Sequence, residues 1–154
     1  MSDVSSIFAR YKVKMDDNKI YDPIRQIYLK ATPEEIVRQK TIKYLERRLK
    51  VPRDKIIVER SLGSLGVPGS RKRIDIGILD ADDLIMAVVE CKASLIGITE
   101  TAHAQAENYL REINTRYFFV TDGFSLYGYY FDTLQFIKLE EIPQYEKWYW
   151  YPKT

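Results

Sequence analysis

Hydrophobic residues recur along the chain at two spacings, one typical of helices and one typical of strands. After Thr32, apolar or small side chains return every three or four positions, at Val37, Thr41, Tyr44, Leu45 and Leu49. This spacing predicts a helix of about four to five turns. Thr32 is a suitable N-cap and Pro33 suits the first helical position, so we expect the helix to begin there. A second stretch with the same period predicts a helix from about Thr101 to Ile113.

Short runs rich in branched and aromatic residues predict the strands. They are KIIVER, RIDIGILD, LIMAVVECKA, RYFFVTDG, SLYGYYFD and LQFIKL. The segment SLGSLGVPGSRKR after the first run holds three glycines and a proline, which predict an irregular loop. Acidic residues around Ala81 to Asp83 predict the turn of a hairpin. The order helix, strand, hairpin, helix, strand predicts an α/β fold with a central mixed β-sheet flanked by α-helices.

Length and composition indicate one domain spanning residues 1–154. A chain of this size buries a core without disulfide or metal staples, and no linker divides it. Residues 1–22 are polar and weakly periodic, so we expect an N-terminal arm, and residues 140–154 form an aromatic C-terminal tail. We expect the tail's rings to pack over the domain's own core or onto a partner, with stacking on unpaired bases as the alternative.

Composition also bears on where the protein works. No apolar run is long enough to cross a bilayer, and the N-terminus has no signal segment. The single cysteine, Cys91, cannot form an internal disulfide and lies in an apolar strand. These features predict a cytoplasmic protein with no membrane partner. The net charge of +2 and pI near 8.5 are compatible with a polyanionic partner but do not require one.

Three charged residues, Asp75, Glu90 and Lys92, interrupt the apolar strands of the predicted hairpin. A charge inside a sheet is costly unless it is paired, hydrogen-bonded or bound to a metal. Strand alternation places Glu90 and Lys92 on one face and Cys91 on the other. The predicted turn places Asp75 opposite Glu90 or Val88, which brings the two carboxylates within roughly 5–8 Å of each other.

Two carboxylates at this separation repel each other, and a divalent cation is the simplest relief. Hard oxygen ligands suit Mg²⁺ or Mn²⁺, which we expect as the cofactor. By the same reasoning, Asp75→Asn is expected to stabilise the metal-free protein. The alternative is a salt bridge on a solvated face, against which the neighbouring Ile, Val and Ala residues argue.

The arrangement RIDIGILD…VVECKA resembles the Asp…Glu-x-Lys core of the PD-(D/E)XK nuclease superfamily. From about Tyr21 to Gly123, the order of YDPIRQIYLKATPEEIVRQKTIKYL, IIVERSLG, RKRIDIGILD, VVECKAS and QAENY is similar to the N-terminal nuclease domain of type I restriction enzyme R subunits and to related small stand-alone proteins. The resemblance implies a restriction-endonuclease-like fold and a metal-dependent nuclease. It also implies that Asp75 and Glu90 bind the metal, that the backbone carbonyl of Cys91 is a third ligand, and that Lys92 positions the attacking water.

Further site residues follow from the same resemblance. Gln105 and Tyr109, four apart on the second predicted helix, match a Gln-x-x-x-Tyr motif that lines the site in RecB-like nucleases; ordinary helix packing is the alternative. The family also places a glutamate early in the first helix. Glu34 and Glu35 both qualify, and the helical projection favours Glu34, since Glu35 has the T-x-x-E spacing of a capping box with Thr32.

Two further features of the sequence, a short basic run and the lack of an ATP-binding motif, bear on the expected function. Arg71, Lys72 and Arg73 are candidate phosphate contacts, although a short basic run is usually solvated. The chain has no Walker A sequence, so it cannot translocate DNA by itself. We therefore expect a nuclease acting on nucleic acid, with DNA as the favoured partner and a homodimer or a larger restriction or defence complex left open. The alternative is a non-catalytic module that uses the same fold to bind nucleic acid or protein.

Overall fold

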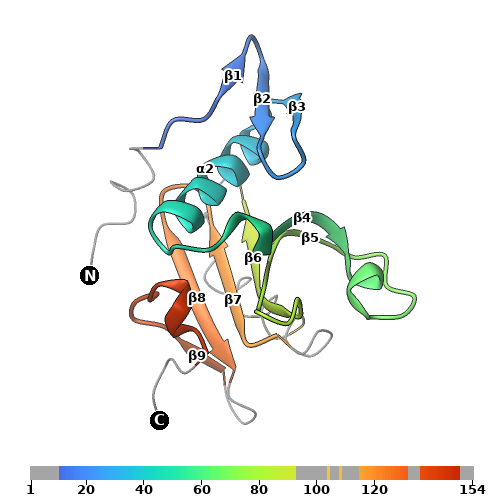
Figure 1. Cartoon of the computed structure of the whole chain (residues 1–154), viewed down its shortest axis with the longest axis vertical. Coiled ribbons are helices and arrows are strands. Elements are labelled where there is room, and N and C mark those ends of the chain that lie inside the picture. Colours follow the sequence, from blue (N-terminus) through green and yellow to red (C-terminus); the bar gives the residue numbers. More distant parts are fainter. Residues whose placement is uncertain (1–10, 93–103, 105–107, 109–114, 132–135, 150–154) are drawn as a thin grey trace.

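The computed structural model describes residues 11–92, 104, 108, 115–131 and 136–149. The main elements are β1 (Met15–Asp16), β2 (Lys19–Asp22), β3 (Ile27–Lys30), α2 (Pro33–Arg47), β4 (Ile56–Ser61), β5 (Arg73–Leu79), β6 (Ile85–Cys91), β7 (Tyr117–Thr121), β8 (Leu126–Phe131) and β9 (Phe136–Lys138). Short 3-10 helices span Arg53–Lys55, Leu62–Leu65 and Tyr145–Lys147. Figure 1 shows their arrangement.

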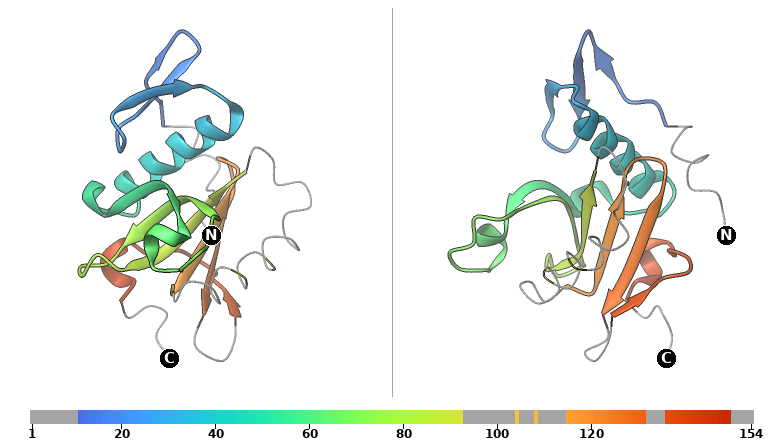
Figure 2. Two further views of the ribbon diagram at one scale, coloured as in Figure 1. Left: turned by 90° about the vertical axis from the view of Figure 1, so that its right-hand side faces the viewer. Right: turned by 180° about the vertical axis from the view of Figure 1, so that it is seen from behind.

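The larger sheet has six strands in the order β4-β5-β6-β7-β8-β9. Neighbouring strands are antiparallel except β6 and β7, which are parallel. The predicted mixed α/β architecture is therefore confirmed. Figure 2 shows α2 lying between this sheet and a smaller one.

The first predicted helix is confirmed as α2. Thr32 is its N-cap, and the Thr32 hydroxyl oxygen accepts a hydrogen bond from the backbone N–H of Glu35 at 3.1 Å. Pro33 occupies the first helical position, where its missing N–H costs nothing. Val37 and Leu45 are buried against the sheet, as the apolar spacing predicts, and Ile42 is buried with them. Of the second predicted helix, 101–113, the structure describes only residues 104 and 108, and both are helical.

The sheet has an apolar cluster on each side. The cluster facing α2 contains buried side chains of the helix and of β4 to β8, and it includes Trp148, which is 0% exposed. The hydroxyl of Tyr117 donates a hydrogen bond to the backbone oxygen of Trp148 at 2.8 Å. The expectation that the aromatic tail packs over the domain's own core is thus confirmed for Trp148. The second cluster comprises Leu62, Ile74, Val88, Phe118, Val120 and Tyr129.

Residues 15–30 form a small antiparallel sheet, β1-β2-β3, which the sequence analysis did not predict. Ile20 is its fully buried residue. The carboxylate of Asp22 is also buried, and it accepts hydrogen bonds from the backbone N–H groups of Ile24 and Arg25, which closes the turn into β3. The guanidinium of Arg25 in this turn also contacts Glu35 at 3.3 Å, which attaches the small sheet to α2. Among the described helices, none is long and apolar enough to cross a membrane.

Candidate functional site

The hairpin of β5 and β6 carries the three charged residues singled out in the sequence. The predicted turn is confirmed, because the backbone N–H of Asp80 donates to the carbonyl of Leu84 and the strands run antiparallel on either side. Ile76 pairs with Val89, so the next position on each strand brings Asp75 beside Glu90. Of the two registers expected, the one opposite Glu90 is therefore the observed one.

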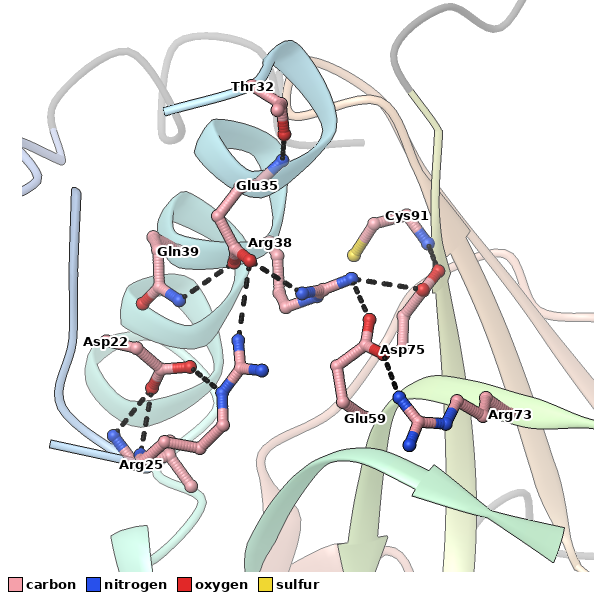
Figure 3. Close-up of polar contacts among 11 residues, drawn as sticks. Asp22, Arg25, Thr32, Glu35, Arg38, Gln39, Glu59, Arg73, Asp75 and Cys91 are labelled. Carbon is pink, nitrogen blue, oxygen red and sulfur yellow. Dashed lines mark hydrogen bonds and ion pairs between the residues drawn. The ribbon is translucent and has the colours of Figure 1, made fainter. Parts of the chain in front are cut away.

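Asp75 is held by both the sheet and the helix. One of its carboxylate oxygens, Oδ2, accepts a hydrogen bond from the backbone N–H of Cys91 at 2.8 Å. The other, Oδ1, lies 3.3 Å from the Nη2 atom of Arg38 on α2 (Figure 3). Its side chain is 15% exposed. These contacts fix the orientation of the carboxylate where the paired part of the hairpin ends.

Glu90 and Lys92 lie together on β6 and just beyond it. The Lys92 Nζ atom is 3.6 Å from the Glu90 Oε2 atom, which agrees with the prediction that the two side chains share a face. The glutamate side chain is 9% exposed and the lysine side chain 35% exposed, so the carboxylate is largely buried and the lysine is partly accessible to solvent. The backbone N–H of Lys92 donates to the carbonyl of Thr121, which extends the pairing of β6 with β7 past Cys91.

Cys91 points the other way, into the cluster under α2. Burial raises the pKa of its thiol well above the usual value, and the negative charge of Asp75 raises it further. The thiol therefore stays protonated and packs as a small apolar group. Only the backbone of Cys91 is suited to a role in the site.

A buried arginine that the sequence analysis missed lies at the centre of this region. Arg38 is 6% exposed, and its Nη1 atom donates to the Oε1 atom of Glu35 at 2.8 Å. Its Nη2 atom donates to Glu59 on β4 and lies near Asp75 (Figure 3). Burial alone would lower the pKa of Arg38, but the three carboxylates raise it, so the guanidinium stays charged. Helical spacing could have indicated that Arg38 is buried, since residues 35, 38, 42 and 45 share one face of the helix.

Glu35, and not Glu34, is the helix glutamate that faces the interior. Glu35 is 8% exposed, whereas Glu34 is exposed, so the projection that favoured Glu34 was wrong. Glu35 accepts hydrogen bonds from Arg38, Gln39 and Arg25. Half of the predicted capping box is confirmed, since the Thr32 hydroxyl caps the Glu35 N–H, but the Glu35 carboxylate binds these side chains.

Glu59 joins the basic run to the network. Its backbone has φ of 52°, a left-handed conformation that is unfavourable for a non-glycine residue in a strand. Its carboxylate contacts Arg38 and, at 3.4 Å, the exposed guanidinium of Arg73. Arg71 and Lys72, like Arg73, are exposed where β5 begins, two to four residues before Asp75. The predicted phosphate contacts are therefore accessible and lie near the candidate site.

Not every predicted site residue can be placed. Gln105 and Tyr109 lie outside the described residues, so their roles stay predictions. Among the residues that are described, no three Asp, Glu, His or Cys side chains gather closely enough to hold a metal ion. The chemistry of the donors still fits Mg²⁺ or Mn²⁺, because Asp75 and Glu90 offer hard carboxylate oxygens and each oxygen has more than one lone pair. The backbone carbonyl of Cys91 follows Glu90 directly in sequence.

The sequence of the chain was compared with those of known protein families. Residues 33–143 match the family described as Type I restriction enzyme R protein N terminus (HSDR_N). The chain belongs to this family. The matched segment begins at the first residue of α2, includes β4 to β9, and contains Asp75, Glu90 and Lys92. No curated protein matches the chain.

Proposed function

We propose that this member of the HSDR_N family is a metal-dependent nuclease of the PD-(D/E)XK type that hydrolyses phosphodiester bonds in DNA. The observation that carries the proposal is the placement of Asp75 and the Glu90-x-Lys92 pair on adjacent strands, with Lys92 Nζ at 3.6 Å from Glu90. Membership of a family named for a restriction enzyme subunit supports DNA as the substrate.

Each residue in this group has a distinct chemical task. Asp75 and Glu90, with the carbonyl of Cys91, would hold Mg²⁺ or Mn²⁺. When bound, such an ion polarises a phosphodiester oxygen and makes a water more acidic. Lys92 would orient the attacking water, and its charge would offset negative charge that develops on the phosphate. Its ammonium is suited to this task because it is partly exposed and already held by a buried carboxylate.

The structure also bears on how strongly a metal would bind. Arg38 lies 3.3 Å from one Asp75 oxygen and the Cys91 N–H occupies a lone pair of the other. Only two carboxylates contribute, so solvent and substrate phosphate would complete the ligand set. We expect weak binding of Mn²⁺ that is lost in Glu90→Gln, measured by calorimetry. Equal binding by both proteins would place the metal elsewhere.

Cleavage assays test the reaction directly. Plasmid, linear and single-stranded DNA are incubated with the protein, with and without Mg²⁺ or Mn²⁺. We expect metal-dependent cleavage by the wild type and a loss of about 10²-fold or more in Lys92→Ala, because a charged group is removed from the reacting phosphate. Lys50→Ala, at an exposed position, is the matched control. Undiminished cleavage by Lys92→Ala would point to a contaminating nuclease.

One observation favours a second function, a non-catalytic module that binds nucleic acid or protein. The charge of Asp75 is already compensated by Arg38 and by the Cys91 N–H, so its burial has a purely structural explanation. In that case the wild type would bind DNA and cleave none of its forms with either metal. The same assays therefore separate the two functions.

A further inference from the structure

A cationic pocket lies on the side of α2 that faces the small sheet. It has a volume of about 180 Å³. Lys14 and Tyr21 of the small-sheet region form one wall, and Gln39, Lys43 and Arg47 of α2 form the other. Arg53, from the 3-10 helix before β4, completes it. The pocket therefore joins three segments that are far apart in the sequence.

Positive charge in this pocket exceeds negative charge. Its lining holds four cationic residues, Lys14, Lys43, Arg47 and Arg53, and one carboxylate, Glu46. Four positive charges and one negative charge leave a net charge of +3 in a small volume. Like charges gathered this closely repel one another and destabilise the folded protein unless an anion joins them.

Lys43 is the cation that most needs a partner. Its side chain is partly buried, and within the described part of the chain its ammonium has no hydrogen bond and no ion pair. Burial lowers its pKa, and the neighbouring charge of Arg47 lowers it further. A partly buried ammonium loses solvation, and the attraction of Glu46, which raises the pKa, offsets only part of that loss. The pocket lining thus includes a donor that an acceptor from outside the chain could satisfy.

The other three cations are only partly engaged. Arg53 forms an ion pair with Glu46, with 3.1 Å between Nε and Oε2, yet it is 60% exposed. Arg47 lies over the ring of Tyr11 and Lys14 over the ring of Tyr21, at 6.0 Å and 5.1 Å from the ring centroids. Contacts with ring faces leave N–H donors free, so these side chains can still contact a second group.

We propose that this pocket binds a backbone phosphate of the nucleic acid, at a position separate from the site of cleavage. Clustered lysine and arginine donors are the groups that bind phosphate oxygens, and a volume of this size admits a phosphate group. The inference rests on the proposed binding of nucleic acid by this chain. It adds an anchoring contact that neither the Asp75 region nor the basic run before β5 supplies.

The pocket has a fixed relation to the candidate site because α2 forms part of both. Gln39, in the pocket wall, donates to the Oε2 atom of Glu35 at 3.1 Å, and the other oxygen of Glu35 binds Arg38. Arg38 in turn contacts Asp75 (Figure 3). Three consecutive side-chain contacts therefore connect the pocket to the candidate metal ligand. A phosphate held at the pocket would set the position of the strand relative to Asp75.

The test measures how DNA binding depends on salt. Fluorescence anisotropy with a labelled DNA duplex, in EDTA to prevent cleavage, gives the affinity between 50 and 200 mM salt for wild type, Lys43→Gln and Arg47→Gln. Because the pocket holds one phosphate and each lost phosphate contact reduces the salt slope by about 1, each variant should show a reduction of up to about 1, and the double variant should not exceed about 1. The matched control is Lys147→Gln, which removes one exposed positive charge from the 3-10 helix Tyr145–Lys147. This short helix, red in Figure 1, lies at the opposite end of the molecule from the small sheet.

Two further measurements make the result decisive. Lys43→Gln should melt no lower than the wild type, since it relieves repulsion, whereas a structural role for Lys43 would lower its melting temperature. Inorganic phosphate, followed by NMR, tests whether the pocket binds a free anion. Phosphate binding with unchanged DNA slopes would overturn the nucleic-acid assignment.

The failures of the two proposals are distinguishable. If the wild type binds DNA and the pocket variants keep the slope of Lys147→Gln, the pocket proposal is wrong, while the proposed function is decided separately by the cleavage assays. If the wild type binds no form of DNA, both are wrong.

Discussion

The two halves of α2 lie on the same sheet but bury different kinds of side chain. Besides Val37, the first half buries the polar residues Glu35, Arg38 and Gln39. Glu35 contacts both Arg38 and Gln39, and Arg38 also contacts the acidic residues of β4 and β5. The second half buries Ile42 and Leu45, which are fully enclosed in the apolar cluster. One helix thus provides a polar interior at one end and an apolar interior at the other.

The two halves therefore contribute differently, one to the stability of the fold and the other to the geometry of the candidate site. Burying a Leu or Ile side chain contributes about 1.5–3 kcal/mol, so the second half of α2 stabilises the fold. Burying an ion network gains little over a well-packed apolar core, because desolvation offsets the attraction between the charges. A network of this kind beside Asp75 is better explained by the orientation that it gives to that carboxylate.

The largest effect is expected at the centre of the polar half. Arg38→Met leaves Glu35, Glu59 and Asp75 without their shared cation, and it should lower the free energy of unfolding by about 3–5 kcal/mol in urea denaturation. Arg73→Met is the control, since Arg73 is 67% exposed and its guanidinium lies at the edge of the network, in contact with Glu59. A neutral or stabilising Arg38→Met would mean that the carboxylates do not depend on the arginine.

The apolar half should respond by a different mechanism. Leu45→Ala creates a cavity under α2 and should cost about 2–5 kcal/mol. The loss should be nearly independent of salt, whereas the loss in Arg38→Met should change with salt because it concerns charges. Leu84→Ala, at a side chain that is 65% exposed, serves as the control. Equal salt dependence in the Leu45 and Arg38 variants would erase the distinction between the halves.

Asp75→Asn tests whether the polar half holds the sheet carboxylate. Repulsion from Glu90 alone predicts stabilisation, but the contacts with Arg38 and the Cys91 N–H reverse the expected sign. Asparagine keeps an acceptor for the N–H and loses the charge, so unfolding should become easier by about 1–2 kcal/mol in metal-free buffer. Asp82→Asn, in the exposed turn, should change little. A higher melting temperature for Asp75→Asn would restore the repulsion argument.

The smallest effect concerns the start of the polar half. Thr32→Ala removes the oxygen that accepts the Glu35 N–H and should cost about 1 kcal/mol. Thr32→Ser retains that oxygen and should be close to the wild type in the same thermal denaturation experiment. If both variants lose equal stability, the cap contributes through its methyl group instead.

Much of the fold was predictable because its signals are local. The helix from Pro33 and the hairpin of β5 and β6 follow from residue spacing and turn residues. The exact register was left open between two alternatives, because an irregularity between Ile78 and Leu79 shifts the pairing and no turn residue reports it. The small sheet gave no such signal, because its strands are two to four residues long and mostly exposed. Short polar strands have too little alternation to be recognised.

The candidate site was predicted in part for the same reason. Glu90 and Lys92 share a strand, so alternation alone puts them together. The contact of Arg38 with Glu59 and Asp75 joins three elements through tertiary packing, and no local pattern reports it. The wrong choice of Glu34 has a related cause, because a projection from apolar residues alone ignores the buried arginine that draws Glu35 inward.

The parallel contact between β6 and β7 has a consequence for the order of folding. Strands β4 to β6 form one antiparallel run and β7 to β9 another, and each can form from neighbouring segments. Residues 92–116 separate the two runs, and a parallel pair cannot be closed by a tight turn. We expect this non-local pairing of β6 with β7 to form late, since the entropy of closing the long connection must be overcome first. Glu90 and Cys91 pair with Val120 and Thr121 of β7, so the β6 side of the candidate site reaches its final position only once this pairing has formed.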